Sequence, residues 1–255
     1  MKVGATLIIT VAFGKGGTGK TTTALALAQY AAKQGHTVLA VDCDPQANYT
    51  YCLGGDPAAP GLYDVIAGRA KPGDVLQSVG GVDLLGAGLE LSEADADLEN
   101  RPLVLRGIVD SLQDSYDLVV IDSQPSLCPL QFNALCAADG VILPMEADTL
   151  AMMGLYQMDM TLGQVADVCQ EAGLDAPDLL GILLIRYKPL QRLTRSLQDQ
   201  IADQAAAMGT RVFATKIREG VALRQSQAMR TSLYEYAPKS NPAKDYAALC
   251  SEIGL

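Results

Sequence analysis

A lysine- and glycine-rich segment close to the start of the chain has the spacing of a phosphate-binding loop. It fills the pattern GxxxxGK[ST] over residues 14–21, between an apolar run and a segment rich in Ala and Leu. Glycines allow successive backbone N–H groups to face one anion, and the start of a helix adds the positive end of its dipole. We expect nucleotide binding by Gly14, Lys15, Gly16, Gly17, Thr18, Gly19, Lys20, Thr21 and Thr22.

Two residues of this loop have the side chains that triphosphate chemistry needs. The ammonium group of Lys20 is expected to reach the β- and γ-phosphates, and the hydroxyl of Thr21 to ligate Mg²⁺. The cofactors expected from the loop are therefore ATP and Mg²⁺.

Three aspartates follow apolar, strand-like runs and could complete a magnesium site. Asp122 follows the run Leu118–Ile121. Asp42 ends the run Thr37–Asp42, and Asp44 comes two residues later. The carboxyl ends of parallel strands form the ligand-binding edge of a sheet. There, Asp122 would hold Mg²⁺ through water, while one of Asp42 and Asp44 helps organise the metal and the other orients an attacking water. A solvated loop with an Asx turn before Pro45 is the alternative for this pair.

The order of the expected elements is that of a parallel sheet with helices between its strands. A strand at Thr6–Phe13, the loop, a helix at Thr21–Gln34 and a strand at Thr37–Asp42 make a βαβ unit. Further strands are expected at Val82–Leu85, Leu118–Ile121, Val141–Leu143 and Leu179–Ile185, and further helices at Pro102–Leu112, Leu150–Gln170, Leu193–Met208 and Pro242–Ile253. The Gly- and Pro-rich segment 54–81 is interpreted as loops. We expect an α/β fold with a doubly wound, mostly parallel sheet. It would form a single ATPase domain over residues 1–255, without an N-terminal helix-turn-helix domain.

Charge is distributed unevenly along the chain. The net charge of −10 argues against a nucleic-acid partner, because phosphates repel an acidic surface. Residues 186–230 are the exception, since nine basic and three acidic side chains give this segment a net charge of +6. Seven of the nine are arginines, which suit phosphate geometry. The segment is either a phosphate-binding patch or an ordinary solvated face.

Cysteine usage and hydropathy indicate the compartment. The six cysteines are scattered and include no CxxC pair, which is typical of reduced thiols. No apolar run reaches the length of a membrane span, and the N-terminus lacks a secretory pattern. We expect a cytoplasmic protein.

Several motifs together resemble the ParA/MinD group of ATPases. The loop carries a second lysine, Lys15, as in the deviant Walker A motif of that group. Residues 42–48 (DCDPQAN) resemble the ParA form of the second motif, and residues 121–127 (IDSQPSL) are similar to the family's IDxPPSL. Residues 133–139 and the segment YAPKS at 236–240 match later parts of the pattern, so the resemblance runs from residue 8 to about 253.

The resemblance implies a catalytic arrangement built from two subunits. ATP binding produces a nucleotide-sandwich dimer in this family, and Lys15 would reach the phosphates held by the other subunit. Lys20 is then assigned to the phosphates of its own site, Thr21 to Mg²⁺ and Asp44 to positioning the water. Asp42 and Asp122 are assigned to the outer shell of the metal. A lysine delivered by dimerisation makes hydrolysis conditional on assembly, as an arginine finger supplied in trans does.

The branch of the family follows from the late part of the chain. The last ten residues contain no basic side chain, so a membrane anchor is not expected. Partition ATPases bind DNA without sequence preference through basic residues late in the chain. The candidates here are Arg192, Arg195, Arg218, Arg224 and Arg230.

The expected function is that of a nucleoid-associated ATPase that partitions a plasmid or chromosome. Its expected partners are a second copy of the chain, non-specific double-stranded DNA, and a ParB-like centromere-binding or adaptor protein that stimulates hydrolysis. Two alternatives stay open: a ParA-type positioning ATPase for a protein cargo, and a metabolic P-loop ATPase without DNA binding.

Three positions depart from the family's pattern. Gln124 stands where the first of two prolines is usual, and Arg218 stands where many relatives have a proline near the adenine. Ala222 occupies a position where an arginine often contacts DNA, and Arg224, two residues later, is the expected substitute.

DNA binding is expected to be strongly salt-dependent. If the patch makes about six phosphate contacts, log K falls against log salt with a slope near −5. A salt series with random-sequence duplex DNA, run with a slowly hydrolysed ATP analogue and with ADP, measures this. No binding with either nucleotide would make the basic segment an ordinary solvated face.

Overall fold

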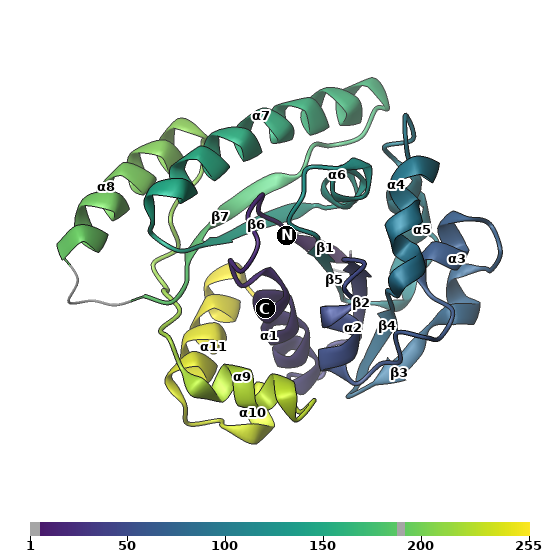
Figure 1. Ribbon diagram of the computed structural model, residues 1–255, viewed down its shortest axis with the longest axis horizontal. Coiled ribbons are helices and arrows are strands. Elements are labelled where there is room, and N and C mark those ends of the chain that lie inside the picture. Colours follow the sequence, from purple (N-terminus) through teal and green to yellow (C-terminus); the bar gives the residue numbers. More distant parts are fainter. Residues whose placement is uncertain (1–5, 188–191) are drawn as a thin grey trace.

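A seven-stranded sheet forms the centre of the computed structural model, which describes residues 6–187 and 192–255 (Figure 1). The strand order is β3-β4-β2-β5-β1-β6-β7, and every neighbouring pair is parallel except β3 and β4. The strands are β1 (Leu7–Val11), β2 (Val38–Cys43), β3 (Gln77–Val79), β4 (Val82–Leu85), β5 (Leu118–Ser123), β6 (Gly140–Met145) and β7 (Asp178–Leu184). The doubly wound, mostly parallel sheet predicted from the sequence is confirmed.

Helices cover both faces of the sheet, which is why its central strands are apolar without interruption. Ile9 and Val11 of β1 pack on one face with α1 (Lys20–Lys33) and α11 (Asn241–Ile253), whereas Ile8 packs on the other. The first face is also covered by α2 (Asn48–Leu53), α9 (Val221–Ala228) and α10 (Leu233–Tyr236). The second is covered by α3 (Leu62–Ile66), α4 (Ala94–Asp97), α5 (Val104–Asp110), α6 (Pro129–Cys136), α7 (Thr149–Glu171) and α8 (Arg192–Ala207). Figure 1 shows α7 and α8 on the opposite side of the sheet from α1 and α11.

The elements missed from the sequence are all short. The segment 54–81 contains α3, a 3₁₀ turn at Pro72–Val75 and the strand β3, none of which was expected. α2, α4, α9 and α10 were also missed, because elements of four to eight residues carry too few apolar positions to show a period. The longer predicted elements agree with the structure to within about two residues at each end.

Within residues 6–187 and 192–255, no helix combines the length and the apolar character that a bilayer span requires.

One glycine lets α7 approach the start of the phosphate-binding loop. A Cβ atom on Gly154 would lie 2.8 Å from Cζ of Phe13, which is fully buried just after β1. No heavy atom lies within 4 Å of the corresponding position on Gly163, further along the same helix. The close contact at Gly154 therefore sets the distance between α7 and the loop.

Gly154→Ala should destabilise the protein and Gly163→Ala should stabilise it. We expect a loss of about 1–3 kcal/mol at Gly154, because Phe13 must move in a packed core. At the exposed Gly163, replacing glycine inside a helix should add about 0.5–1 kcal/mol. Urea denaturation of both variants tests the pair, and equal effects would show that the approach of α7 to Phe13 is not tight.

Candidate nucleotide site

The register of three strands brings the loop and the aspartates together. Asp42 of β2 lies opposite Asp122 of β5, and Val11 of β1 lies opposite Asp122 from the other side. The loop over residues 14–19 follows β1 directly, and α1 begins at Lys20. Gly17 and Gly19 have φ angles of 76° and 75°, a region that favours glycine. The register therefore places Asp42 and Asp122 side by side at the carboxyl edge of the sheet, where the loop leaves β1.

Lys20 and Thr21 point into this edge. Lys20 is buried, and its Nζ donates to the carbonyl oxygen of Lys15 at 3.1 Å. Thr21 Oγ1 donates to Asp122 Oδ2 at 2.6 Å. The other carboxylate oxygen of Asp122 is buried and has no hydrogen-bond partner among the described residues. Asp122 therefore holds the Thr21 hydroxyl in place and presents an unsatisfied oxygen beside it.

Burial is the largest cause of the shifted pKa values of Asp122, Asp42 and Lys20. Burial, and then the charge of Asp42, raise the pKa of Asp122 well above its usual range. Burial also raises the pKa of Asp42 to about 6, although the hydrogen bonds that Asp42 accepts lower it. The pKa of Lys20 is lowered by burial, although Asp122 and Asp44 act in the opposite direction.

These donors fit a hydrated magnesium ion. Mg²⁺ in phosphate sites usually keeps several waters and takes one or two side-chain ligands together with substrate phosphates. A hydroxyl, a buried carboxylate oxygen without a partner and two further aspartates match that requirement. Among the described residues, no group of three or more His, Cys, Asp or Glu side chains forms a closed metal cage. The donors therefore suit a metal that arrives with a phosphate ligand.

Asp42 and Asp44 differ in how much of their hydrogen-bonding capacity the protein already uses. Asp42 Oδ2 accepts from the backbone N–H and the hydroxyl of Thr50, both at 2.8 Å, and Asp42 Oδ1 accepts from the N–H of Asp44. Thr50 in turn accepts from the N–H of Ala87. Asp44 Oδ1 accepts from the N–H of Gln46. Asp42 is thus tied into α2 and shapes the turn that carries Asp44. Thr50 was missed from the sequence because nothing local marks it as a partner of Asp42.

Lys15 lies on the outer side of the loop, unlike Lys20. Its Nζ lies 2.6 Å from Asp148 Oδ2, and the Lys15 side chain is 37% exposed. Asp148 is also the N-cap of α7, where Oδ1 accepts from the N–H of Ala151. Sequence reasoning missed Asp148; an aspartate just before a helical run signals a cap, but not which lysine pairs with it.

The arginines proposed for DNA contact are in different environments. The partly exposed Arg218 makes two side-chain hydrogen bonds to the nearly buried carboxylate of Asp245. Arg230 donates to the carbonyl oxygens of Tyr51 and Gly55. Arg224 is exposed on α9. The side chains of Arg192 and Arg195, at the start of α8, lie outside the described part of the structure.

α9 is also connected to the nucleotide loop. Gln227 Nε2 of α9 donates to Thr22 Oγ1 at 2.9 Å. Thr22 is next to Thr21, so the helix that carries Arg224 touches the first turn of α1 directly.

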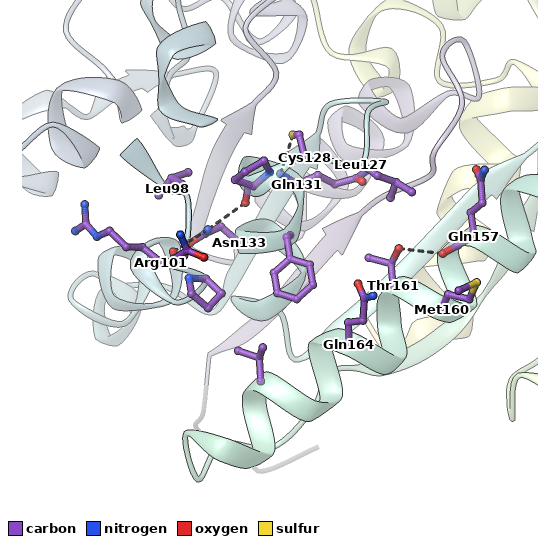
Figure 2. Close-up of a pocket in the computed structure, with 15 residues that line it drawn as sticks. Leu98, Arg101, Leu127, Cys128, Gln131, Asn133, Gln157, Met160, Thr161 and Gln164 are labelled. Atoms are coloured by element: carbon purple, nitrogen blue, oxygen red, sulfur yellow. Dashed lines mark hydrogen bonds between the residues drawn. The ribbon is translucent and has the colours of Figure 1, made fainter. Parts of the chain in front are cut away.

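A separate apolar groove of about 600 Å³ lies between α6 and α7 (Figure 2). Its walls include Leu127 and Cys128, which follow β5, and Met160 and Thr161 of α7. Figure 2 shows Gln131 and Asn133 of α6 beside it. Gln124 is buried at the same turn, and its amide donates to Cys128 Sγ. The groove therefore borders the segment that leaves Asp122, although it is distinct from the phosphate loop.

The chain is similar to known ATPases over nearly its whole length. A family model described as an AAA domain matches residues 6–172. The chain is 38% identical to the chromosome-partitioning ATPase Soj of Thermus thermophilus over 247 residues, which cover 96% of this chain and 94% of that protein.

Two solved structures share nearly the whole fold. The ATP complex of Cyanothece McdA is 25% identical with a TM-score of 0.85, covering 98% of this chain and 97% of that one. Cobyrinic acid a,c-diamide synthase of Mycobacterium smegmatis, with a bound ATP analogue and magnesium, is 31% identical with a TM-score of 0.81. That match covers 96% of this chain and 93% of the other.

Buried carboxylates without a cation should make the nucleotide-free protein less stable as the pH rises. Because burial raises the pKa of Asp42 and Asp122 in the folded state, their ionisation opposes folding above the pKa of an unfolded aspartate, about 4. Stability should therefore fall from about pH 4 through about pH 6, where Asp42 titrates in the folded protein.

Asp122→Asn removes one of these ionisations. We expect the variant, free of nucleotide and metal, to be more stable than the unsubstituted protein at neutral pH by about 1–3 kcal/mol. The difference should shrink towards pH 4. Asp159→Asn, at an exposed site on α7, is the matched control for a change of charge alone. Urea denaturation across the pH range measures both, and a variant that is less stable at every pH would contradict the assignment.

Proposed function

Because the chain belongs to the family of Soj and ParA partition ATPases, we propose that it is a DNA-partitioning ATPase that dimerises on binding ATP and Mg²⁺. In the dimer it binds DNA without sequence preference, and a ParB-like partner stimulates hydrolysis and release. The protein then works in the cytoplasm on the nucleoid. The support comes from the relatives, from the geometry of the loop and the aspartates, and from the basic segment late in the chain.

Each residue of the site has a defined task in this proposal. ATP would supply the terminal phosphoryl group, and a bound Mg²⁺ would add positive charge beside its oxygens. Lys20 leaves the carbonyl of Lys15 and turns to the phosphates, and Thr21 offers its hydroxyl oxygen to the metal. Asp122 would hold the outer shell of the metal through its unpartnered oxygen. Asp44 orients the attacking water, and Asp42 keeps the turn of Asp44 in position while contributing its charge to the outer shell of the metal.

The contrast between the two lysines carries the proposal. Lys20 is buried in its own site, whereas Lys15 has a partly exposed side chain on the outside of the same loop. A lysine on the outside can reach the phosphates of a second subunit that faces the loop. Dimerisation would then complete the positive charge that the transition state requires, as an arginine finger does in other phosphoryl-transfer enzymes.

The DNA surface is placed on the basic segment 186–230. Arg224 is the leading contact, because it is exposed on α9 and its helix touches the loop through Gln227 and Thr22. Arg218 and Arg230 are partly exposed. Arg218 is also paired with Asp245, and Arg230 donates to the carbonyl oxygen of Gly55, just after α2. We propose that they contribute charge and that their loss costs stability as well.

A metabolic ATP-dependent enzyme is the second candidate. It is favoured by the 31% identity to cobyrinic acid a,c-diamide synthase over nearly the whole chain.

An ATPase that positions a protein cargo would share the nucleotide chemistry of the partition ATPase. ATP-dependent co-purification separates these two, since a DNA-binding adaptor supports partitioning and a structural cargo adaptor supports positioning.

Lys15→Ala separates the partition proposal from the metabolic one. We expect loss of ATP-dependent dimerisation and a fall in ATP hydrolysis of about 10²-fold or more, because the charge supplied in trans is gone. Lys71→Ala, at an exposed site, controls for the loss of a positive charge. Light scattering and phosphate release measure both. A monomeric Lys15→Ala protein that hydrolyses ATP like the unsubstituted chain would favour the metabolic enzyme.

Arg224→Ala tests the DNA surface. Loss of one phosphate contact should weaken binding to every duplex about equally and reduce the slope of log K against log salt by about one. Fluorescence anisotropy with random-sequence duplexes, with Lys71→Ala as the control, measures the slope. An unchanged slope would remove Arg224 from the interface.

A further inference from the structure

The lysine proposed to act on a second subunit is held by its own subunit. Lys15 Nζ lies 2.6 Å from Asp148 Oδ2, between side chains that are 37% and 40% exposed. The two residues are 133 positions apart, so the fold and not the local sequence creates the contact. A Lys15 side chain in this position is directed to α7 of its own chain.

The position of Asp148 is fixed from several sides. Its Oδ1 caps α7 by accepting from the N–H of Ala151, and its own N–H donates to the carbonyl oxygen of Glu146. Glu146 is in turn paired with Arg186. α7 rests on Phe13 through Gly154, immediately before the loop. Asp148 is therefore a stationary anchor, and Lys15 is the member of the pair that can move.

The loop is also closed on itself at the same residue. Lys20 Nζ and Thr18 Oγ1 both donate to the carbonyl oxygen of Lys15. Phosphates that draw Lys20 away remove one of these bonds from the backbone of Lys15. The entry of a triphosphate thus loosens the residue whose side chain Asp148 holds.

We propose that Asp148 is a positioning residue that keeps Lys15 on its own subunit and so opposes dimerisation until a triphosphate on the facing subunit competes for the ammonium group. This inference rests on the proposed role of Lys15 in trans. It adds a residue to the reaction that the loop motif does not include. It also gives the aspartate at the start of α7 a second task besides capping.

The Lys15–Asp148 ion pair is strong enough to weaken dimerisation but too weak to prevent it. We call the Lys15–Asp148 contact the latch. Exposed ion pairs are weak, so breaking one latch changes an equilibrium constant by a factor of about 1.5 to 5. A symmetric dimer opens two latches, which makes the effect on its dissociation constant about 2- to 25-fold. A triphosphate, with several negative charges, can overcome a competitor of that size.

Asp148→Asn isolates the charge from the cap. Asparagine caps helices as well as aspartate does, so Asp148→Asn should lower Tm only by what the weak ion pair contributes, whereas Asp148→Ala should lower Tm by about a further 2–4 °C. Asp159→Asn, an exposed aspartate on the same helix, makes the same change in net charge without a contact to Lys15. These three variants form the test set.

Two measurements on the full chain follow. In the nucleotide-free protein, acylation of Lys15 by an amine-reactive reagent, read by mass spectrometry, should be about 1.5 to 5 times faster in Asp148→Asn than in Asp159→Asn. With a slowly hydrolysed ATP analogue and Mg²⁺, analytical ultracentrifugation should show the dimer of Asp148→Asn forming at a 2- to 25-fold lower protein concentration, about the square of the single-latch effect.

The outcomes separate the latch from the function on which it rests. Faster labelling and tighter dimerisation in Asp148→Asn alone support the latch. If the unsubstituted chain dimerises and Asp148→Asn dimerises equally well or less well, the latch is wrong and the proposed function stands. If no variant dimerises with the analogue, the proposed function fails and the latch falls with it.

Discussion

Two carboxylates lie side by side on neighbouring parallel strands, at a depth where water cannot solvate them. The register of β2 and β5 sets Asp42 opposite Asp122, and both are completely buried. Lys20, whose charge acts on Asp122, is itself buried and has a lowered pKa. Ionised carboxylates in such surroundings carry a large desolvation cost unless positive charge is supplied. The site is thus incomplete without a cation, and the loop that binds phosphates delivers one together with its ligand.

The phosphate loop and the sheet could be predicted from the sequence because their causes are local. Glycines at residues 17 and 19 adopt left-handed φ angles that the motif itself requires, and the apolar runs of β1, β2 and β5 are continuous because both faces are covered. The contacts that tune the site depend on distant partners instead. Asp148 meets Lys15, and Asp245 meets Arg218, only after the chain has folded. Thr50 gives no local sign that it holds Asp42.

The basic segment shows how folding redistributes the roles of charged residues. A net charge of +6 over residues 186–230 describes the segment, but the structure already uses several of these side chains. Arg186 pairs with Glu146, Arg218 with Asp245, and Arg230 holds the end of α2. An arginine that is paired within the chain offers less charge to DNA than a count from the sequence indicates. Exposure on α9 therefore says more about Arg224 than the total charge of the segment does.

Subunit mixing tests most directly whether Lys15 completes the site of a second chain. Lys15→Ala and Asp44→Ala chains are each expected to be inactive, since one lacks the lysine supplied in trans and the other the aspartate that orients water. A mixed dimer has one intact site, made of Asp44 from the first chain and Lys15 from the second. The mixed dimer keeps one Lys15, so an equal mixture should recover activity that neither chain has alone. Random pairing would give about a quarter of the unsubstituted activity, because half of the dimers are then mixed and each has one of two sites intact. Mixed dimers that form and are still as inactive as either chain alone would contradict the account.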